Sequence, residues 1–176
     1  MKITQLLFVL AILGFFAVEA DAQRRTTTRR PAAPRVVTSN TVSTPAAQAA
    51  DMKAGAEKVS IQVKNVTKFI FILGSVAKGI EDLDKDTRAN RAAKQANETN
   101  KREVIQAIRN LRAGLATLEV EFRTKDPLKK HLTVIQGITD LSGQSEDLAL
   151  SGRFMDAGKP LLLVVEKLSD TLVALR

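Results

Sequence analysis

The chain contains no cysteine, no tryptophan and no tyrosine, and it has a single histidine. Without cysteine there is no disulfide framework, zinc–thiolate centre, cysteine nucleophile, iron–sulfur cluster or covalently attached haem. The stability of the folded chain must therefore come from packing. The lack of Trp and Tyr also argues against sugar binding, because those rings are the usual platforms for sugar faces.

Aliphatic side chains are plentiful by contrast. Hydrophobic residues make up 44% of the 176 residues and charged residues 26%, whereas a wholly disordered chain is poorer in aliphatic side chains. The length suits one domain with one core. The formal net charge is +8, and most of it comes from arginines that precede residue 36, so the strong charge belongs to the N-terminal part.

An export signal is predicted at the N-terminus. Lys2 gives a short positive end, and residues 3–18 form a nearly uncharged run, short for a membrane span of about 20 residues but typical of a signal peptide. Ala20-Asp21-Ala22 then matches a cleavage site. We expect residues 1–22 to be removed and the protein to be secreted or periplasmic. On sequence grounds we expect no transmembrane segment after cleavage.

Residues 23–50 are rich in Arg, Thr, Pro and Ala and hold almost no bulky side chain. Three prolines, Pro45 among them, disfavour helix, and the arginines repel one another, so a disordered basic linker is predicted. Its guanidinium groups are candidate contacts for an anionic envelope polymer: Arg24, Arg25, Arg29, Arg30 and Arg35. The alternative is a solubilising spacer. No aromatic residue stands among the arginines to stack on bases, so specific nucleic-acid binding is not expected.

The strongest pattern in the chain predicts a long first helix. Apolar residues recur at alternating steps of four and three, at Met52, Ala56, Val59, Val63, Val66, Ile70, Leu73, Ala77 and Ile80. This spacing holds one face of a helix against a partner and predicts left-handed packing at about +20°. Phe69, Phe71 and Ile72 widen the stripe, so burial on more than one side is expected there.

A second stripe with the same spacing predicts a second helix, at Val104, Ile108, Leu111, Leu115, Leu118 and Phe122. Asn100 followed by Glu103 resembles a capping box, which places the start near Lys101. Asp126-Pro127 resembles the start of the next helix, which places the end near Arg123. The charged residues 84–99 either extend one of these helices or form a loop.

Two more helices are predicted towards the C-terminus. The third runs from Pro127 to about Ser151 and is weakened by Gly137 and Gly143, each costing about 1 kcal/mol relative to Ala. Gly152 matches the left-handed residue that ends a helix. The fourth covers Phe154 to about Leu175, and Pro160 predicts either a kink or a true start at that proline.

The predicted fold class is all-α. The connections at residues 124–126 and 151–152 are too short for anything but antiparallel hairpins. We therefore expect an up-down antiparallel four-helix bundle with a long first helix over residues 51–176, preceded by the disordered basic linker and, before that, the signal peptide.

No residue pattern supports catalysis, a metal or a cofactor. His131 is the only imidazole, and Leu128 stands where a di-iron bundle needs Glu. His131 with Met52 or Met155 could in principle ligate haem, but nothing in the sequence pattern places such a pair close together. Asp82, Asp84 and Asp86 match half of a calcium loop whose second half is missing. Asn65 and Asn97 stand in N-glycosylation sequons, of which Asn97 is the better expected acceptor.

The leading hypothesis is a non-enzymatic, exported interaction or structural module, held at the envelope by its arginines. Its expected partner is another protein or an anionic envelope polymer. The alternative is a small-molecule carrier that holds lipid or haem between helices. The candidate ligand-lining residues are then Phe69, Phe71 and Phe122.

Overall fold

The first helix, α1 (Pro45–Lys85), is 41 residues long in the computed structural model, which describes residues 44–176. The predicted signal peptide, the five linker arginines and residues 23–43 lie outside the described residues. The linker was predicted to end at residue 50, but the helix begins at Pro45. Proline is favoured in the first turn, where its missing N–H would have no helical partner. The Thr44 hydroxyl accepts a hydrogen bond from the Ala47 N–H at 3.4 Å and caps the start.

The predicted apolar stripe of α1 faces the core. Val59, Val66, Leu73 and Ile80, spaced by seven residues, are all buried, and Ala77 is buried beside them. The other stripe positions are partly buried and pack against the same core. Burying such a face is what stabilises a helix of this length in water, because helix propensity alone contributes little.

The second helix, α2 (Arg91–Thr124), starts ten residues before the predicted Lys101. Its cap is Asn90, whose Oδ1 accepts a hydrogen bond from the Ala93 N–H at 2.8 Å, and not Asn100. Residues 91–99 contain several alanines, which favour helix even without an apolar stripe. Only residues 86–90 are left to join α1 to α2, so the charged connection is mostly helical.

The predicted third helix is broken into three pieces, α3 (Asp126–Lys129), α4 (Leu132–Ile135) and α5 (Ile138–Leu150). The break before α5 lies at Gly137, which has a φ of 91°. This left-handed conformation is favourable only for glycine and ends the regular helix. Gly152, with a φ of 79°, ends α5 as the sequence predicts.

The last helix, α6 (Phe154–Ala174), runs through Pro160 without a new start. The proline ring has no N–H, so the Asp156 carbonyl receives no backbone hydrogen bond from residue 160. Pro160 is itself buried. Packing of the helix on both sides of the proline therefore outweighs the lost bond.

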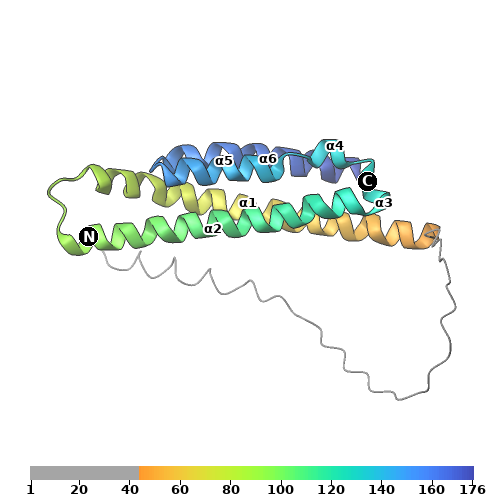
Figure 1. The fold of residues 1–176 in the computed structure, drawn as a ribbon, viewed down its shortest axis with the longest axis horizontal. Coiled ribbons are helices and arrows are strands. Elements are labelled where there is room, and N and C mark those ends of the chain that lie inside the picture. Colours follow the sequence, from red (N-terminus) through yellow and green to blue (C-terminus); the bar gives the residue numbers. More distant parts are fainter. Residues whose placement is uncertain (1–43) are drawn as a thin grey trace, which may run out of the picture. The chain divides into compact units, whose positions relative to one another are not determined.

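The four long helices lie side by side (Figure 1). α1 packs against α2 and α6, and α5 packs against α2 and α6, so α5 lies across the core from α1. Their buried side chains form two apolar clusters. One centres on Phe122 and Leu115, and the other on Phe154 and Ile108. The described residues contain no strand, which confirms the all-α class.

Two helix N-termini are capped by glutamates of other helices. Gly137 and Arg153, which precede α5 and α6, provide no side-chain cap. Instead, Glu119 of α2 accepts a hydrogen bond from the Thr139 hydroxyl at 2.8 Å and longer ones, at 3.4 Å, from the N–H groups of Thr139 and Gly137. Glu81 of α1 accepts from the Met155 N–H at 2.8 Å. A carboxylate at a helix N-terminus also interacts favourably with the helix dipole.

A third interhelical contact joins the end of α1 to α2. The Asn97 side chain is 3% exposed, and its Nδ2 donates to the Ile80 carbonyl at 3.1 Å and to Asp84 Oδ1 at 2.9 Å. Asp84 also pairs with Lys101. The prediction that Asn97 is the better glycan acceptor is therefore wrong for the folded protein, because its amide is enclosed between two helices. Asp84 belongs to this contact and not to a calcium loop.

α1 is also long and apolar enough, by length and composition alone, to cross a membrane, since an 18-residue stretch of it has a mean hydropathy of 1.2. This corrects the expectation that no segment after residue 22 is apolar enough. Core helices of water-soluble domains can be equally long and apolar. In α1 the buried line of Val59, Val66, Leu73 and Ile80 forms such a core face, which we call the core seam. Only 17% of the 18-residue stretch is buried, however, so α1 presents apolar side chains on its outer side as well.

We predict that Glu119→Ala lowers the free energy of unfolding by about 1–2 kcal/mol, the usual effect of removing a helix cap. Urea denaturation measures this loss, and hydrogen exchange should quicken at the first amides of α5. Glu119→Gln keeps one acceptor oxygen and should lose less. Glu166→Ala, an exposed glutamate of α6, is the control and should change stability by at most about 0.5 kcal/mol. Equal effects of Glu119→Ala and Glu166→Ala would show that the cap contributes nothing.

Candidate functional site

The titratable side chains of residues 44–176 are scattered or used structurally. No group of three or more His, Asp or Glu in this part of the chain could hold a metal ion. One interhelical ion pair is at Glu146 of α5, whose Oε1 lies 2.6 Å from Arg109 Nε and whose Oε2 lies 3.1 Å from Arg112 Nη1. These hydrogen bonds, chiefly that from Arg109, lower the pKa of Glu146. The carboxylate stays ionised and ties α5 to α2, which does not suit an acid–base catalyst.

His131 lies between α3 and α4 and is partly buried. Its Nε2 is enclosed and has no hydrogen-bond partner among the described residues. Burial is the main cause that lowers the pKa of His131, and the charge of Lys130 adds to it. Both effects favour the neutral imidazole over the imidazolium.

The three phenylalanines predicted to line a ligand cavity do not come together. Phe122 is completely buried within the larger core cluster, and Phe69 is partly buried between the two clusters. Phe71 is 81% exposed, so its predicted place in the core is wrong. The physical reason is angular: residues 69 and 71 differ by about 200° around a helix, so the core seam takes one and leaves the other outside.

Exposed apolar side chains concentrate on two neighbouring helices. Of the eight large hydrophobic residues that are exposed in residues 44–176, six belong to α1 or α6. They are Ile61, Phe71, Met155, Leu162, Leu163 and Val173. Singly exposed apolar residues are ordinary, but a concentration of them indicates an interaction surface.

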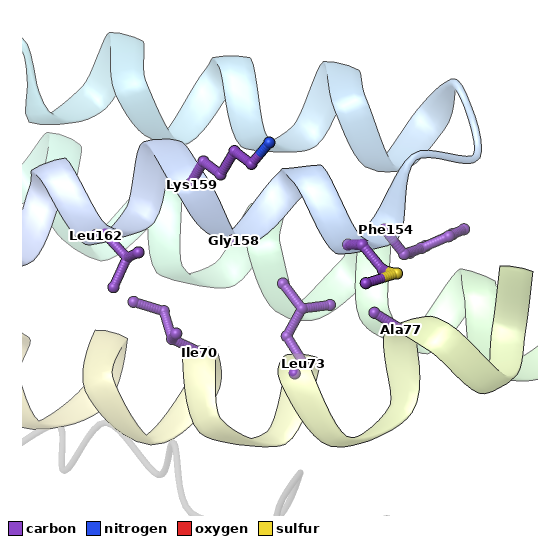
Figure 2. Close-up of a pocket in the computed structure, with 9 residues that line it drawn as sticks. Ile70, Leu73, Ala77, Phe154, Gly158, Lys159 and Leu162 are labelled. Carbon is purple, nitrogen blue, oxygen red and sulfur yellow. The ribbon is translucent and has the colours of Figure 1, made fainter.

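An open apolar groove lies between these two helices (Figure 2). Its volume is about 210 Å³, too small for a haem or a lipid tail to be enclosed. Ile70 and Leu162 face each other across it, and the buried residues Leu73, Ala77 and Phe154 also line it. Gly74, Met155, Gly158 and Lys159 complete the lining.

Two of the residues that line the groove are glycines inside helices, and they add no side chain to its walls. A Cβ atom on Gly74 would meet nothing within 4 Å, and one on Gly158 would only touch a Leu73 methyl at 3.8 Å. Alanine at either position would therefore fit the chain, and in a helix interior it would be more stable by about 1 kcal/mol. The two glycines leave the groove without side chains at these positions, so its apolar lining is open to a second molecule.

Comparison of the chain with models of protein families, with curated proteins and with solved structures gives no match. The groove therefore has to be interpreted from its own chemistry. It holds one charged side chain, that of Lys159, which pairs with Asp156. The rest of its lining is apolar, which suits binding of an apolar surface.

Sequence reasoning located the helices that form the groove but not the groove itself. Pro160 stood out only as an obstacle to a helix. Gly74 lies directly after a seam residue and gave no signal, because the seam pattern depends on the apolar positions alone. An interior glycine with no turn to form did not single out this surface either, because Gly79 has the same property and lies outside the groove.

We predict that folding becomes less stable as the pH falls below about 6.5, the usual pKa of histidine in an unfolded chain. Because the pKa of His131 is lowered in the folded state, the unfolded chain binds a proton first and gains stability as acid is added. Urea denaturation from pH 7.5 to 5.5 measures this slope. His131→Gln should flatten it, and Lys130→Gln should leave most of it. An unchanged slope in His131→Gln would contradict the assignment.

Proposed function

We propose that this protein is an exported, non-enzymatic interaction protein that binds an apolar face of a helical partner in the groove between α1 and α6. The observation that carries the proposal is the open apolar groove itself, across which Ile70 and Leu162 face each other and in which Gly74 adds no side chain. Where two helices approach closely, small residues at the crossing point allow their backbones to come together. A partner helix could insert one large side chain between Gly74 and Gly158.

As part of this proposal, residues 44–176 form an up-and-down antiparallel four-helix bundle. Short connections support it, since residues 86–90 join α1 to α2 and residues 151–153 join α5 to α6. Each long helix also packs against two of the others. Such a scaffold is rigid, which suits a surface that must be ready before its partner arrives.

The proposal also includes export and attachment at the cell envelope. The predicted signal peptide supports export, and the five arginines from Arg24 to Arg35 support binding to an anionic polymer. The carrier alternative has less support, because Phe71 is exposed and the groove is small.

The arginine attachment predicts a salt-sensitive association with the envelope fraction of the host. Replacing all five arginines with glutamine should release the protein at low salt, because each lost positive charge weakens attraction to fixed anions. The unaltered chain should be released only at high salt. Equal retention of the two proteins at low salt would remove the arginines from the proposal.

The groove is tested by placing a photocrosslinking amino acid at Leu162 in the host. Leu162 is 57% exposed at the groove, and Leu150 of α5, across the core, is 55% exposed and serves as the matched control. We expect a discrete adduct with one protein, identified by mass spectrometry, from position 162 only.

Gly74→Leu should abolish this adduct by filling the groove. Gly79→Leu is its matched control, because Gly79 is an exposed glycine of the same helix with equally open surroundings but lies outside the groove. Both changes should keep or raise the helix stability. An adduct that survives Gly74→Leu, or one that forms equally at position 150, would contradict the proposal.

A further inference from the structure

The outer side of α1 carries a second stripe with the same seven-residue spacing as its core seam. Positions 57, 61, 64, 68, 71, 75 and 78 follow one another at steps of four and three, and all seven are exposed. They therefore lie along one side of the helix, away from the seam. We call this line of residues the outer stripe.

The middle of the outer stripe is both basic and apolar. Ile61, Lys64, Lys68 and Phe71 follow one another there, with Ile61 at 53% and Phe71 at 81% exposure. Neither lysine forms an ion pair with any residue from 44 to 176. No Asp or Glu occurs between Lys58 and Ile80, so α1 itself does not neutralise this charge.

The ends of the outer stripe differ from its middle. Lys78 is paired with Asp82, and Glu57 gives the opposite end a negative charge. The adjacent helix α6 exposes Glu166 and Asp170. Along the outer stripe, the unneutralised positive charge is therefore confined to Lys64 and Lys68, and Phe71 follows directly after them.

We propose that the outer stripe of α1 binds the surface of a bilayer containing anionic phospholipid, with Phe71 inserted below the headgroups and Lys64 and Lys68 against their phosphates. A helix surface with basic side chains beside exposed aromatic and aliphatic ones is the chemistry of interfacial binding. Lysine extends its charged end to the headgroups while its aliphatic stem lies along the apolar layer.

A lipid surface fits the outer stripe better than a protein does. A stable protein interface covers about 800 Å² on each partner with a central apolar core, whereas here two apolar side chains stand about 15 Å apart along the helix with lysines between them. The contact is peripheral and does not span the bilayer. The seam of α1 is buried against α2 and α6, as Val66 and Leu73 show, and spanning would require the core to open.

The absence of tryptophan and tyrosine makes this proposal directly testable. A full-length Phe71→Trp protein has one local fluorophore, so association through the N-terminal arginines does not imitate insertion at α1. With vesicles of phosphatidylcholine and phosphatidylglycerol, its emission should shift to the blue and be quenched by brominated lipid. Leu150→Trp, on the opposite helix α5, is the matched control and should show neither change.

The charge component is tested in the same protein. Phe71→Trp combined with Lys64→Gln and Lys68→Gln should need about thirtyfold more anionic lipid for half of the shift, and vesicles of phosphatidylcholine alone should give almost no shift. An unchanged Phe71→Trp spectrum, or an equal shift at position 150, would overturn the proposal.

Adding Gly74→Leu to Phe71→Trp separates this surface from the groove. The shift should persist, because Gly74 does not belong to the outer stripe. Loss of the shift would assign the lipid contact to the groove and overturn the proposal for the stripe. The photocrosslinking at Leu162 tests the groove independently of this proposal, because it detects a protein partner and needs no lipid.

Discussion

The fold depends on the seven-residue repeat of buried side chains in α1. Val59, Val66, Leu73 and Ile80 lie on one line of a helix that has few local charge pairs and depends on the packing of this apolar face for its stability in water. That line forces α2 and α6 to lie along α1, and α5 then closes the far side. The two core clusters meet at Phe69, which touches both. The core seam buries only one side of α1, and the groove and the outer stripe lie on the part of the helix surface that it leaves exposed.

Much of this arrangement was predictable from the sequence, and the reason is geometric. The stripes of α1 and α2 depend only on apolar spacing, and their predicted residues face the core. The errors lie where one local interaction outweighs a pattern. Asn90 starts α2 although Asn100 has the better motif, and Gly137 breaks a helix that the spacing alone would continue. Pro45 begins a helix that proline was expected to prevent, because the position within the first turn decides its effect.

The candidate surfaces were less predictable, because they consist of the side chains that remain exposed after the helices have packed together. Phe71 belongs to a run of apolar residues in sequence and differs from Phe69 only by its angle around the helix. Whether Gly74 is needed for internal packing cannot be judged until the neighbouring helix is in place. The same is true of the caps: Glu81 and Glu119 look like solvent-exposed acids in the sequence, and their partners Met155 and Thr139 are distant along the chain.

The enclosed amide of Asn97 has a consequence for biosynthesis. Its Nδ2 is the atom to which an oligosaccharide would be joined, and in the folded protein it is occupied by the Ile80 carbonyl and Asp84. In a host that glycosylates exported chains, modification would have to precede the pairing of α1 with α2. A sugar added in that interval would keep the two helices apart at this end. In such a host, the proportion of chains carrying it would then depend on how fast α1 pairs with α2 relative to the glycosylation reaction.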